Sequence, residues 1–147
     1  MANQQQLDLL KQGVATQWNR WREEHPDTAI RLNGVDLSGT NLGEVNLAGA
    51  DLSGADLRGA DLNHANLSKA TLAGVDLSGA NLAAADLSAA DLSGTNLSNA
   101  NLTEADLAGA NLHGAALFGA RLNWAILEET LITTEQLSQA RVERDSL

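Results

Sequence analysis

The 147-residue chain contains no cysteine and no tyrosine, a single proline, one phenylalanine and three tryptophans. Without cysteine it can form no disulfide framework and no thiol site, so we expect a reducing or neutral compartment, the cytoplasm. No apolar run approaches the roughly 20 residues that span a bilayer. Residues 1–10 also lack the basic start and apolar core of a secretory signal. We therefore expect no membrane partner.

Basic residues are scarce as well. Nine Lys and Arg stand against 19 Asp and Glu, which gives a formal net charge of −10. Most of this excess falls between residues 30 and 129. Direct binding of nucleic acid requires clustered Lys and Arg, so we expect no direct contact with nucleic acid.

Leucine, by contrast, recurs at every fifth position from Leu32 to Leu127. A helix repeats every 3.6 residues and a strand every 2, so neither explains this period. Self-similarity at a fixed period indicates stacked identical units. Each unit consists of a small residue, Asp or Asn, Leu and two variable residues, as in Ala-Asp-Leu-Ser-Gly at 50–54.

This unit resembles that of the pentapeptide-repeat family, A-[DN]-L-x-x, and the resemblance covers residues 30–129. The segment from Leu10 to Arg22 also resembles the leaders of bacterial, notably cyanobacterial, members. The resemblance implies an all-β solenoid, a right-handed quadrilateral β-helix with four units in each coil. The central Leu and the small residue before it would point inward. Twenty units would then make about five coils, with a helical cap at each end.

The fifth residue of the units supports a repeat of four units. When every fourth unit is grouped together, the four groups correspond to the four sides of a coil. The fifth residue is Gly in nearly every unit of two sides. It is never Gly on a third side, where it is Glu44, His64, Ala84, Glu104 and Trp124. Glycine is favoured where a turn needs positive φ. We therefore expect glycine-demanding turns on two sides and turns free of that demand on the third.

The two ends depart from the repeat, because a stacked fold must cover its last coils. Residues 1–29 are predicted to form an N-terminal cap and linker, with one amphipathic helix over 4–24. Its apolar stripe comprises Leu7, Leu10, Val14, Trp18 and Trp21. We interpret the two tryptophans as part of this lid on the first coil.

Residues 130–147 are predicted to form a C-terminal cap. Thr133 and Gln136 have the spacing of a capping box, which predicts a helix near 134–144. We expect Phe118, Trp124 and Ile126 to pack beneath or beside it. A dimerisation surface uses the same apolar residues, so the protein is predicted to be a monomer or a C-terminal homodimer.

No catalytic, cofactor-binding or metal site is predicted. The three histidines, His25, His64 and His113, are dispersed along the chain, and no ligand set or pair of nucleophile and base forms. We therefore predict that the chain is not an enzyme and needs no cofactor.

Two surface features remain. Asp36, Asp56 and Asp76 follow one another at twenty-residue spacing. In one interpretation the stacked carboxylates repel one another, which raises some of their pKa values or recruits a cation. In the other, each carboxylate bonds its own turn and Arg58 relieves the repulsion. The second feature is the glycine-free column, which contains Glu44, His64, Glu104 and Trp124. These four residues and the three aspartates are the predicted partner surface.

These observations favour a non-catalytic structural or protein-interaction scaffold of unknown partner. The alternative is an acidic DNA mimic that binds DNA gyrase or another DNA-binding protein. Some pentapeptide-repeat proteins protect gyrase from quinolones with an acidic rod that stands in for duplex DNA, and the resemblance implies this possibility here.

Overall fold

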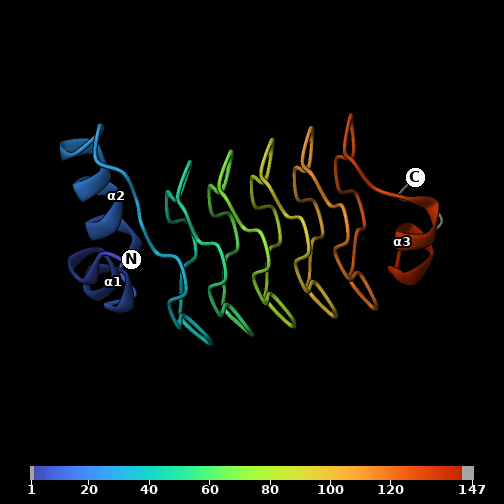
Figure 1. Cartoon of the computed structure of the whole chain (residues 1–147), viewed down its shortest axis with the longest axis horizontal. Helices are drawn as coiled ribbons and strands as arrows, with labels where there is room; N and C mark the ends of the chain where they lie inside the picture. The colour runs from blue at the N-terminus through green and yellow to red at the C-terminus, as the bar shows by residue number, and fades with distance from the viewer. Residues whose placement is uncertain (1, 144–147) are drawn as a thin grey trace.

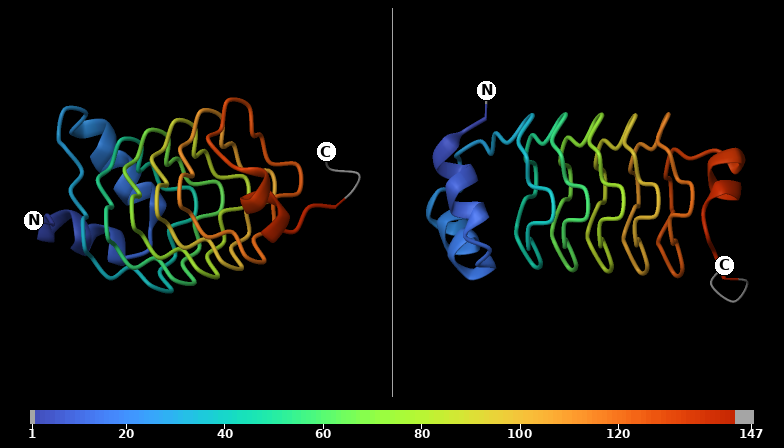
Figure 2. Two further views of the ribbon diagram at one scale, coloured as in Figure 1. Left: turned by 45° about the vertical axis from the view of Figure 1, so that its right-hand side comes forward. Right: turned by 90° about the horizontal axis from the view of Figure 1, so that it is seen from below.

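The computed structural model describes residues 2–143 as a rod of stacked coils with a helical segment at each end (Figure 1). Two helices, α1 (Gln4–Lys11) and α2 (Ala15–Glu24), cover the N-terminal end, and the short helix α3 (Thr134–Gln139) lies at the C-terminal end. Between them the coils follow one another along the long axis (Figure 2). The final residues of the predicted C-terminal cap, 144–147, lie outside the described residues.

Each coil contains four five-residue units, because parallel bridges join residues twenty positions apart along the whole rod. We name the sides A, B, C and D. They begin with residues 30–34, 35–39, 40–44 and 45–49, and each recurs every twenty residues. Each bridge stands alone, so the predicted strands are absent among residues 2–143. A turn follows every leucine and leaves no room for a longer strand.

The backbone hydrogen bonds around Leu52 show how coils are joined. The Leu52 N–H donates to the carbonyl of Thr71 in the next coil, at 2.9 Å. The preceding N–H, of Asp51, donates to the carbonyl of Ile30 in the previous coil, also at 2.9 Å. The N–H of Ala55 returns to the Leu52 carbonyl at 2.9 Å and closes the turn. Neighbouring coils therefore satisfy each other's backbone groups, at a spacing of about 4.8 Å.

The leucines form the core. Every leucine at the third position from Leu32 to Leu117 is fully buried, which confirms that this position points inward. Most first-position residues are buried beside them. Thr95, which is larger than the usual alanine, is accommodated because its hydroxyl donates to the carbonyl of Leu92 at 2.7 Å. Each buried leucine contributes about 1.5–3 kcal/mol, before the entropy cost of ordering the chain.

The Asp or Asn at the second position bonds its own turn, as predicted. The Asp51 carboxylate accepts a hydrogen bond from the Ser53 N–H at 3.0 Å, and the Asn101 amide oxygen accepts one from the Thr103 N–H at 3.1 Å. This is the local bonding that favours these residue types in turns. Most of the acidity of the rod therefore has a structural role.

The fifth residue adopts positive φ in all twenty units, including the glycine-free side, where Glu44 has φ 63° and Ala84 φ 56°. The prediction that this side lacks the demand for positive φ is wrong. The hydrogen bond across each turn, with positive φ at its third residue, is type II geometry, and every unit needs it to change direction. A Cβ on Gly54 or Gly79 would meet no atom within 4 Å. Nothing in the structure explains why glycine gathers on two sides.

The N-terminal lid consists of two helices, so the predicted single helix over 4–24 is wrong. Gly13 follows α1 with φ 69°, the left-handed conformation common just after a helix. Val14 consequently becomes the residue that precedes α2 and is exposed. Leu10 and Trp18 lie in the core, as the stripe predicted, and Trp18 is only 1% exposed.

Side chains of this lid replace the missing coil beneath side D. The Trp18 ring N–H donates to the carbonyl of Asn46 at 2.7 Å, and the Asn19 amide oxygen accepts from the Asn46 N–H at 2.7 Å. Arg22 donates to the carbonyl of Ala48 at 2.9 Å. Beneath side A the Gln6 amide takes this role, since it donates to the Ala29 carbonyl at 2.8 Å and accepts from the Arg31 N–H at 2.9 Å.

The C-terminal end continues the coil register before the chain leaves it. Leu131 bridges Asn111 on side A, and Arg141 bridges Arg121 on side C. Helix α3 occupies the stretch between them, where a unit of side B would stand. It ends at Gln139, earlier than predicted, because Ala140 returns to an extended conformation.

The predicted capping box is present. The Gln136 N–H donates to the Thr133 hydroxyl at 3.1 Å, and the Thr133 N–H donates to the Gln136 side-chain oxygen at 2.8 Å. The same Gln136 amide donates to the carbonyls of Leu112 and Ala115 at 2.6 and 3.0 Å. One side chain thus caps the helix and fastens it to the last coil.

The turn geometry predicts that glycine stabilises side C. Replacing Ala84 by Gly relieves a left-handed alanine, which costs about 1–2 kcal/mol, against a smaller loss of chain entropy. We expect a gain of about 0.5–1 kcal/mol in the free energy of unfolding, measured by urea denaturation. The matched control is Ala83→Gly in the same turn, where φ is not positive. It should destabilise, and a loss of stability from Ala84→Gly would contradict the interpretation.

The lid contacts predict that Gln6 is needed for stability although its neighbour is not. Gln6→Ala empties a buried position and leaves the Arg31 N–H and the Ala29 carbonyl without their partners, which costs about 1–3 kcal/mol. Gln5→Ala removes an exposed side chain from the same helix and should change stability by less than about 0.5 kcal/mol. Thermal unfolding followed by circular dichroism compares the two, and equal melting temperatures would show that Gln6 does not close the first coil.

Candidate interaction surface

The glycine-free column forms a row of side chains at the corner between sides C and D. We name Glu44, His64, Glu104 and Trp124 the corner row. All four are exposed and are separated by one or more coil spacings of about 4.8 Å. Among the described residues, no hydrogen bond or ion pair joins these side chains. The row begins against the lid, because the Asn19 amide donates to the Glu44 carbonyl at 3.0 Å.

The aspartates of the predicted acidic ladder lie in register on side B. Bridges join Asp36 to Asp56 and Asp56 to Asp76. Each carboxylate bonds within its own turn. Asp36 accepts from the Ser38 N–H and hydroxyl, at 3.0 and 2.6 Å, and Asp76 accepts from the Ser78 N–H at 3.0 Å.

Asp56 makes the corresponding bond to the N–H of Arg58 and also pairs with its guanidinium, at 2.5 Å. These contacts match the second interpretation of the ladder, in which each turn holds its own carboxylate. Among residues 2–143, no three His, Cys, Asp or Glu side chains are grouped in a way that could hold a metal ion.

Hydrogen bonding lowers the pKa values of two ladder carboxylates, Asp36 and Asp56. The Ser38 hydroxyl and then the Ser38 N–H hold the pKa of Asp36 below its ordinary value, although the nearby Asp56 charge opposes this. The Arg58 side chain and then its N–H lower the pKa of Asp56. Lowered pKa values mean that these carboxylates stabilise the fold above pH about 4, and that this contribution is lost as the pH falls through their folded pKa values.

The histidines remain apart. His25 stacks on Trp21 in the lid, with ring centres 4.7 Å apart. His64 belongs to the corner row, and His113 lies on side A of the fifth coil. The structure therefore assembles no histidine-based pair from the candidates that the sequence offers.

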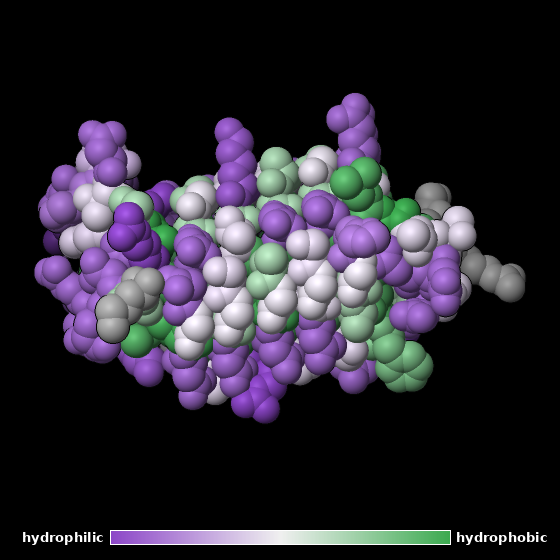
Figure 3. Space-filling model, viewed as in Figure 1, coloured by the Kyte–Doolittle hydropathy of each residue, from purple (hydrophilic) through white to green (hydrophobic). Residues whose placement is uncertain are grey.

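Large exposed apolar side chains concentrate in and just after the fifth coil. Phe118 is 69%, Trp124 54%, Ile126 49% and Leu131 63% exposed. The expectation that Phe118, Trp124 and Ile126 pack against the C-terminal helix is wrong. They occupy the fourth, fifth and second positions of their units, which face outward, and α3 lies over the end of the rod. Figure 3 shows strongly hydrophobic groups standing out near this end.

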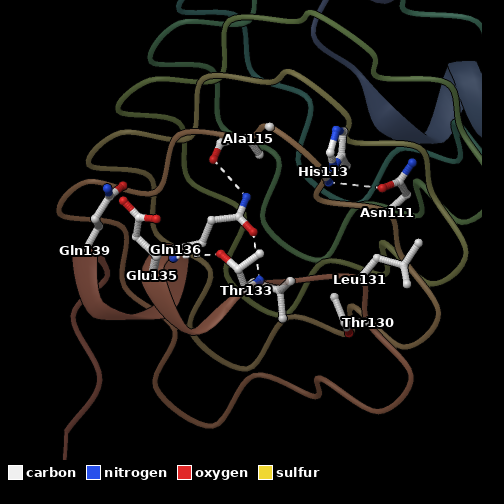
Figure 4. Close-up of a pocket in the computed structure, with 11 residues that line it drawn as sticks. Asn111, His113, Ala115, Thr130, Leu131, Thr133, Glu135, Gln136 and Gln139 are labelled. Atoms are coloured by element: carbon white, nitrogen blue, oxygen red, sulfur yellow. Dashed lines mark hydrogen bonds between the residues drawn. The ribbon is translucent and has the colours of Figure 1, made fainter.

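A groove of about 820 Å³ lies between α3 and side A of the last coils. Gln136 and Gln139 line it from the helix, and Leu131 and Asn111 line it from the coils (Figure 4). Inside it the His113 N–H donates to the Asn111 amide oxygen at 3.0 Å. No motif in the sequence predicted this groove. The only available signal was the change from polar residues to Leu131 at a side A position.

The ladder predicts a local effect on one carboxylate. Ser38→Ala removes the hydroxyl that contributes most to the lowered pKa of Asp36, so this pKa should rise toward its ordinary value. Carboxyl carbon chemical shifts followed by NMR during a pH titration measure it. Ser98→Ala is the control, because the Ser98 N–H bonds the side chain of Asn96, which has no carboxyl group to titrate. An unchanged Asp36 titration in Ser38→Ala would contradict the assigned cause.

Comparison with known proteins places the chain among repeat proteins. The profile of pentapeptide repeats (8 copies) matches residues 30–68, 60–99, 85–123 and 95–133. No curated protein sequence matches. No helix among residues 2–143 combines the length and apolar character needed to cross a membrane.

Solved structures are similar over most of the chain. A pentapeptide repeat protein from the thylakoid lumen of Arabidopsis thaliana is 33% identical, with a TM-score of 0.62, over 72% of this chain and 70% of that one. The pentapeptide repeat protein Rfr23 from the cyanobacterium Cyanothece 51142 is 30% identical, with a TM-score of 0.47, over 86% and 95%. One from Nostoc is 34% identical, with a TM-score of 0.45, over 82% and 91%. The match to the repeat profile over more than half of the chain and the similarity to the Arabidopsis thaliana structure show that the chain belongs to the pentapeptide-repeat family.

Proposed function

We propose that this chain is a non-catalytic scaffold, a right-handed quadrilateral β-helix whose outer surface binds a protein partner. The corner row is the observation that carries the proposal. It presents two carboxylates, an imidazole and an indole on one edge of the rod. The acidic ladder of Asp36, Asp56 and Asp76 lies on side B, separated from the corner row by side C.

The backbone under the corner row is held in place. The His64 N–H donates to the Ala83 carbonyl in the next coil at 2.9 Å, and the Glu104 N–H donates to the Asn123 carbonyl at 2.9 Å. A surface whose backbone is already ordered loses little conformational entropy on binding. This rigidity supports a role in recognition.

The distribution of charge favours the scaffold over the gyrase-binding DNA mimic. Carboxylates of the rod occur on all four sides, for example Asp51 on side A, Asp56 on side B, Asp61 on side C and Asp86 on side D. A mimic of duplex DNA requires a dense band of negative charge that matches many phosphates. Arg58, which pairs with Asp56, interrupts the densest row.

Site-specific crosslinking tests the proposal. A photoreactive phenylalanine analogue placed at position 64 or 104 should crosslink to the same protein in the source cell. The matched controls are positions 53 and 93 on side A, which belong to the same kind of coil. We expect at least tenfold more product from the corner row than from side A. Equal yields, or none from either side, would contradict a partner on this surface.

A gyrase supercoiling assay distinguishes the alternative. The scaffold proposal predicts no inhibition at micromolar protein. Potent inhibition that weakens steeply with added salt would instead establish DNA mimicry, because charge matching is screened by salt.

A further inference from the structure

The fifth coil carries a different chemistry on side C from the coils before it. Phe118 and Trp124 stand at its two corners, Arg121 lies between them, and Arg141 follows one coil later. We name these four residues the arginine–aromatic patch. In the earlier coils the Phe118 position holds Ser38, Arg58, Ser78 and Ser98. The Arg121 position there holds Asn41, Asp61, Asn81 and Asn101, and the Trp124 position holds Glu44, His64, Ala84 and Glu104.

The two arginines have no partner for their charge in the described part of the chain. A parallel bridge joins Arg121 to Arg141, so their backbones lie about one coil spacing apart on the same side of the rod. Both side chains are exposed, and the one ion pair among residues 2–143 is that of Arg58 and Asp56. Guanidinium groups only donate hydrogen bonds, so neither arginine can satisfy the other.

The polar ladder beneath them shows what the arginines replace. The Asn81 amide donates to the Asp61 carboxylate at 3.2 Å, and the Asn101 amide donates to the Asn81 oxygen at 3.4 Å. These contacts pass from coil to coil along side C. This ladder of amide bonds ends at Asn101, and the guanidinium groups of Arg121 and Arg141 find no acceptor among residues 2–143.

A hollow of about 470 Å³ opens at this place, lined by Arg121, Asn123, Ala140, Arg141, Val142 and Glu143. Its floor is ordered, because Asn123 is buried and its amide oxygen accepts from the Glu143 N–H at 3.1 Å. The Glu143 carboxylate shares the wall but lies more than 4.0 Å from both guanidinium groups.

We propose that the arginine–aromatic patch binds an acidic segment of the protein partner. Carboxylates of that segment enter the hollow and pair with Arg121 and Arg141, while its apolar side chains contact Phe118 and Trp124. Arginine pairs with carboxylate in a bidentate geometry, and Arg and Trp are the residue types that dominate interface energy. The inference rests on the proposed function and names the chemistry of the partner.

The overall charge favours a short acidic segment over nucleic acid. A duplex carries one negative charge for about every 1.7 Å of its axis, and the net charge of −10 repels it along the whole rod. A peptide segment brings only a few charges, and repulsion from the distant carboxylates is screened beyond about 8 Å at physiological salt.

Peptide selection tests the proposal with a control taken from the rod itself. Random dodecapeptides displayed on phage are selected on the immobilised chain. Binders to a reverted variant are removed first. This variant carries Phe118→Ser, Arg121→Asn, Trp124→Glu and Arg141→Asn, which are residues that earlier coils hold at the same positions, so it should fold. Circular dichroism verifies the fold.

We expect selected peptides to combine Asp or Glu with apolar residues. Binding is then measured by fluorescence anisotropy. Replacing the acidic residues of a selected peptide by their amides should weaken binding at least tenfold, and so should Arg121→Asn in the protein. Thr71→Asn on side A should leave it unchanged. Selected peptides without acidic residues, or no peptide that prefers the natural chain, would overturn the proposal.

Other occupants give distinct results. Self-association in sedimentation that disappears in the reverted variant would identify a second copy as the ligand. Binding of a duplex oligonucleotide would identify a phosphate backbone as the ligand. Peptide binding that is seen only when the chain is shortened to end at Glu143 would show that residues 144–147 of the chain itself occupy the patch. Each of these overturns the proposal. If the peptide selection fails but the corner row still crosslinks to a protein, the scaffold function is supported and only the proposal for the arginine–aromatic patch is contradicted.

Discussion

The structure depends on one requirement, that the backbone groups on each side of a coil find partners in the coils next to it. A buried N–H or carbonyl without a partner is costly, and among residues 2–143 the bridges stand alone, so no longer strand offers an alternative. The bonds of Leu52 to Thr71 and of Asp51 to Ile30 are therefore repeated all along the rod. A coil one residue longer or shorter would shift every pair. This explains why the five-residue period runs from Leu32 to Leu127 without interruption.

The same requirement determines how the rod ends. At the N-terminus no coil exists to pair with Asn46 and Arg31, and side chains from the lid take its place through Trp18, Asn19 and Gln6. At the C-terminus the Gln136 amide does so for the carbonyls of Leu112 and Ala115. Helices are suitable covers because their own backbone bonds are internal, so they present side chains and no open edge.

Stacking also separates the residues that maintain the fold from those that are free to change. Inward positions are limited to Leu and small residues by the space inside the coil, and the second position is occupied by Asp or Asn because these bond the turn. The outward fourth and fifth positions carry neither constraint. The corner row and the change from Ser98 and Glu104 to Phe118 and Trp124 therefore reflect surface chemistry. Such a rod acquires a binding surface by exchanging outward residues while the backbone stays the same.

The sequence by itself determined the turn bonds of Asp and Asn and the capping box at Thr133, because each follows from spacing and local hydrogen bonding. It predicted the four-unit coil and the inward leucines through its resemblance to the pentapeptide-repeat unit. Only the tertiary structure decided that Gly13 divides the lid and that Glu44 and Ala84 adopt left-handed turns. A turn required by its neighbouring coils overrides the preference of a single residue. The bridge between Arg121 and Arg141 was equally beyond the sequence. It depends on where the chain lies after it leaves the repeat, and only the packed end determines that.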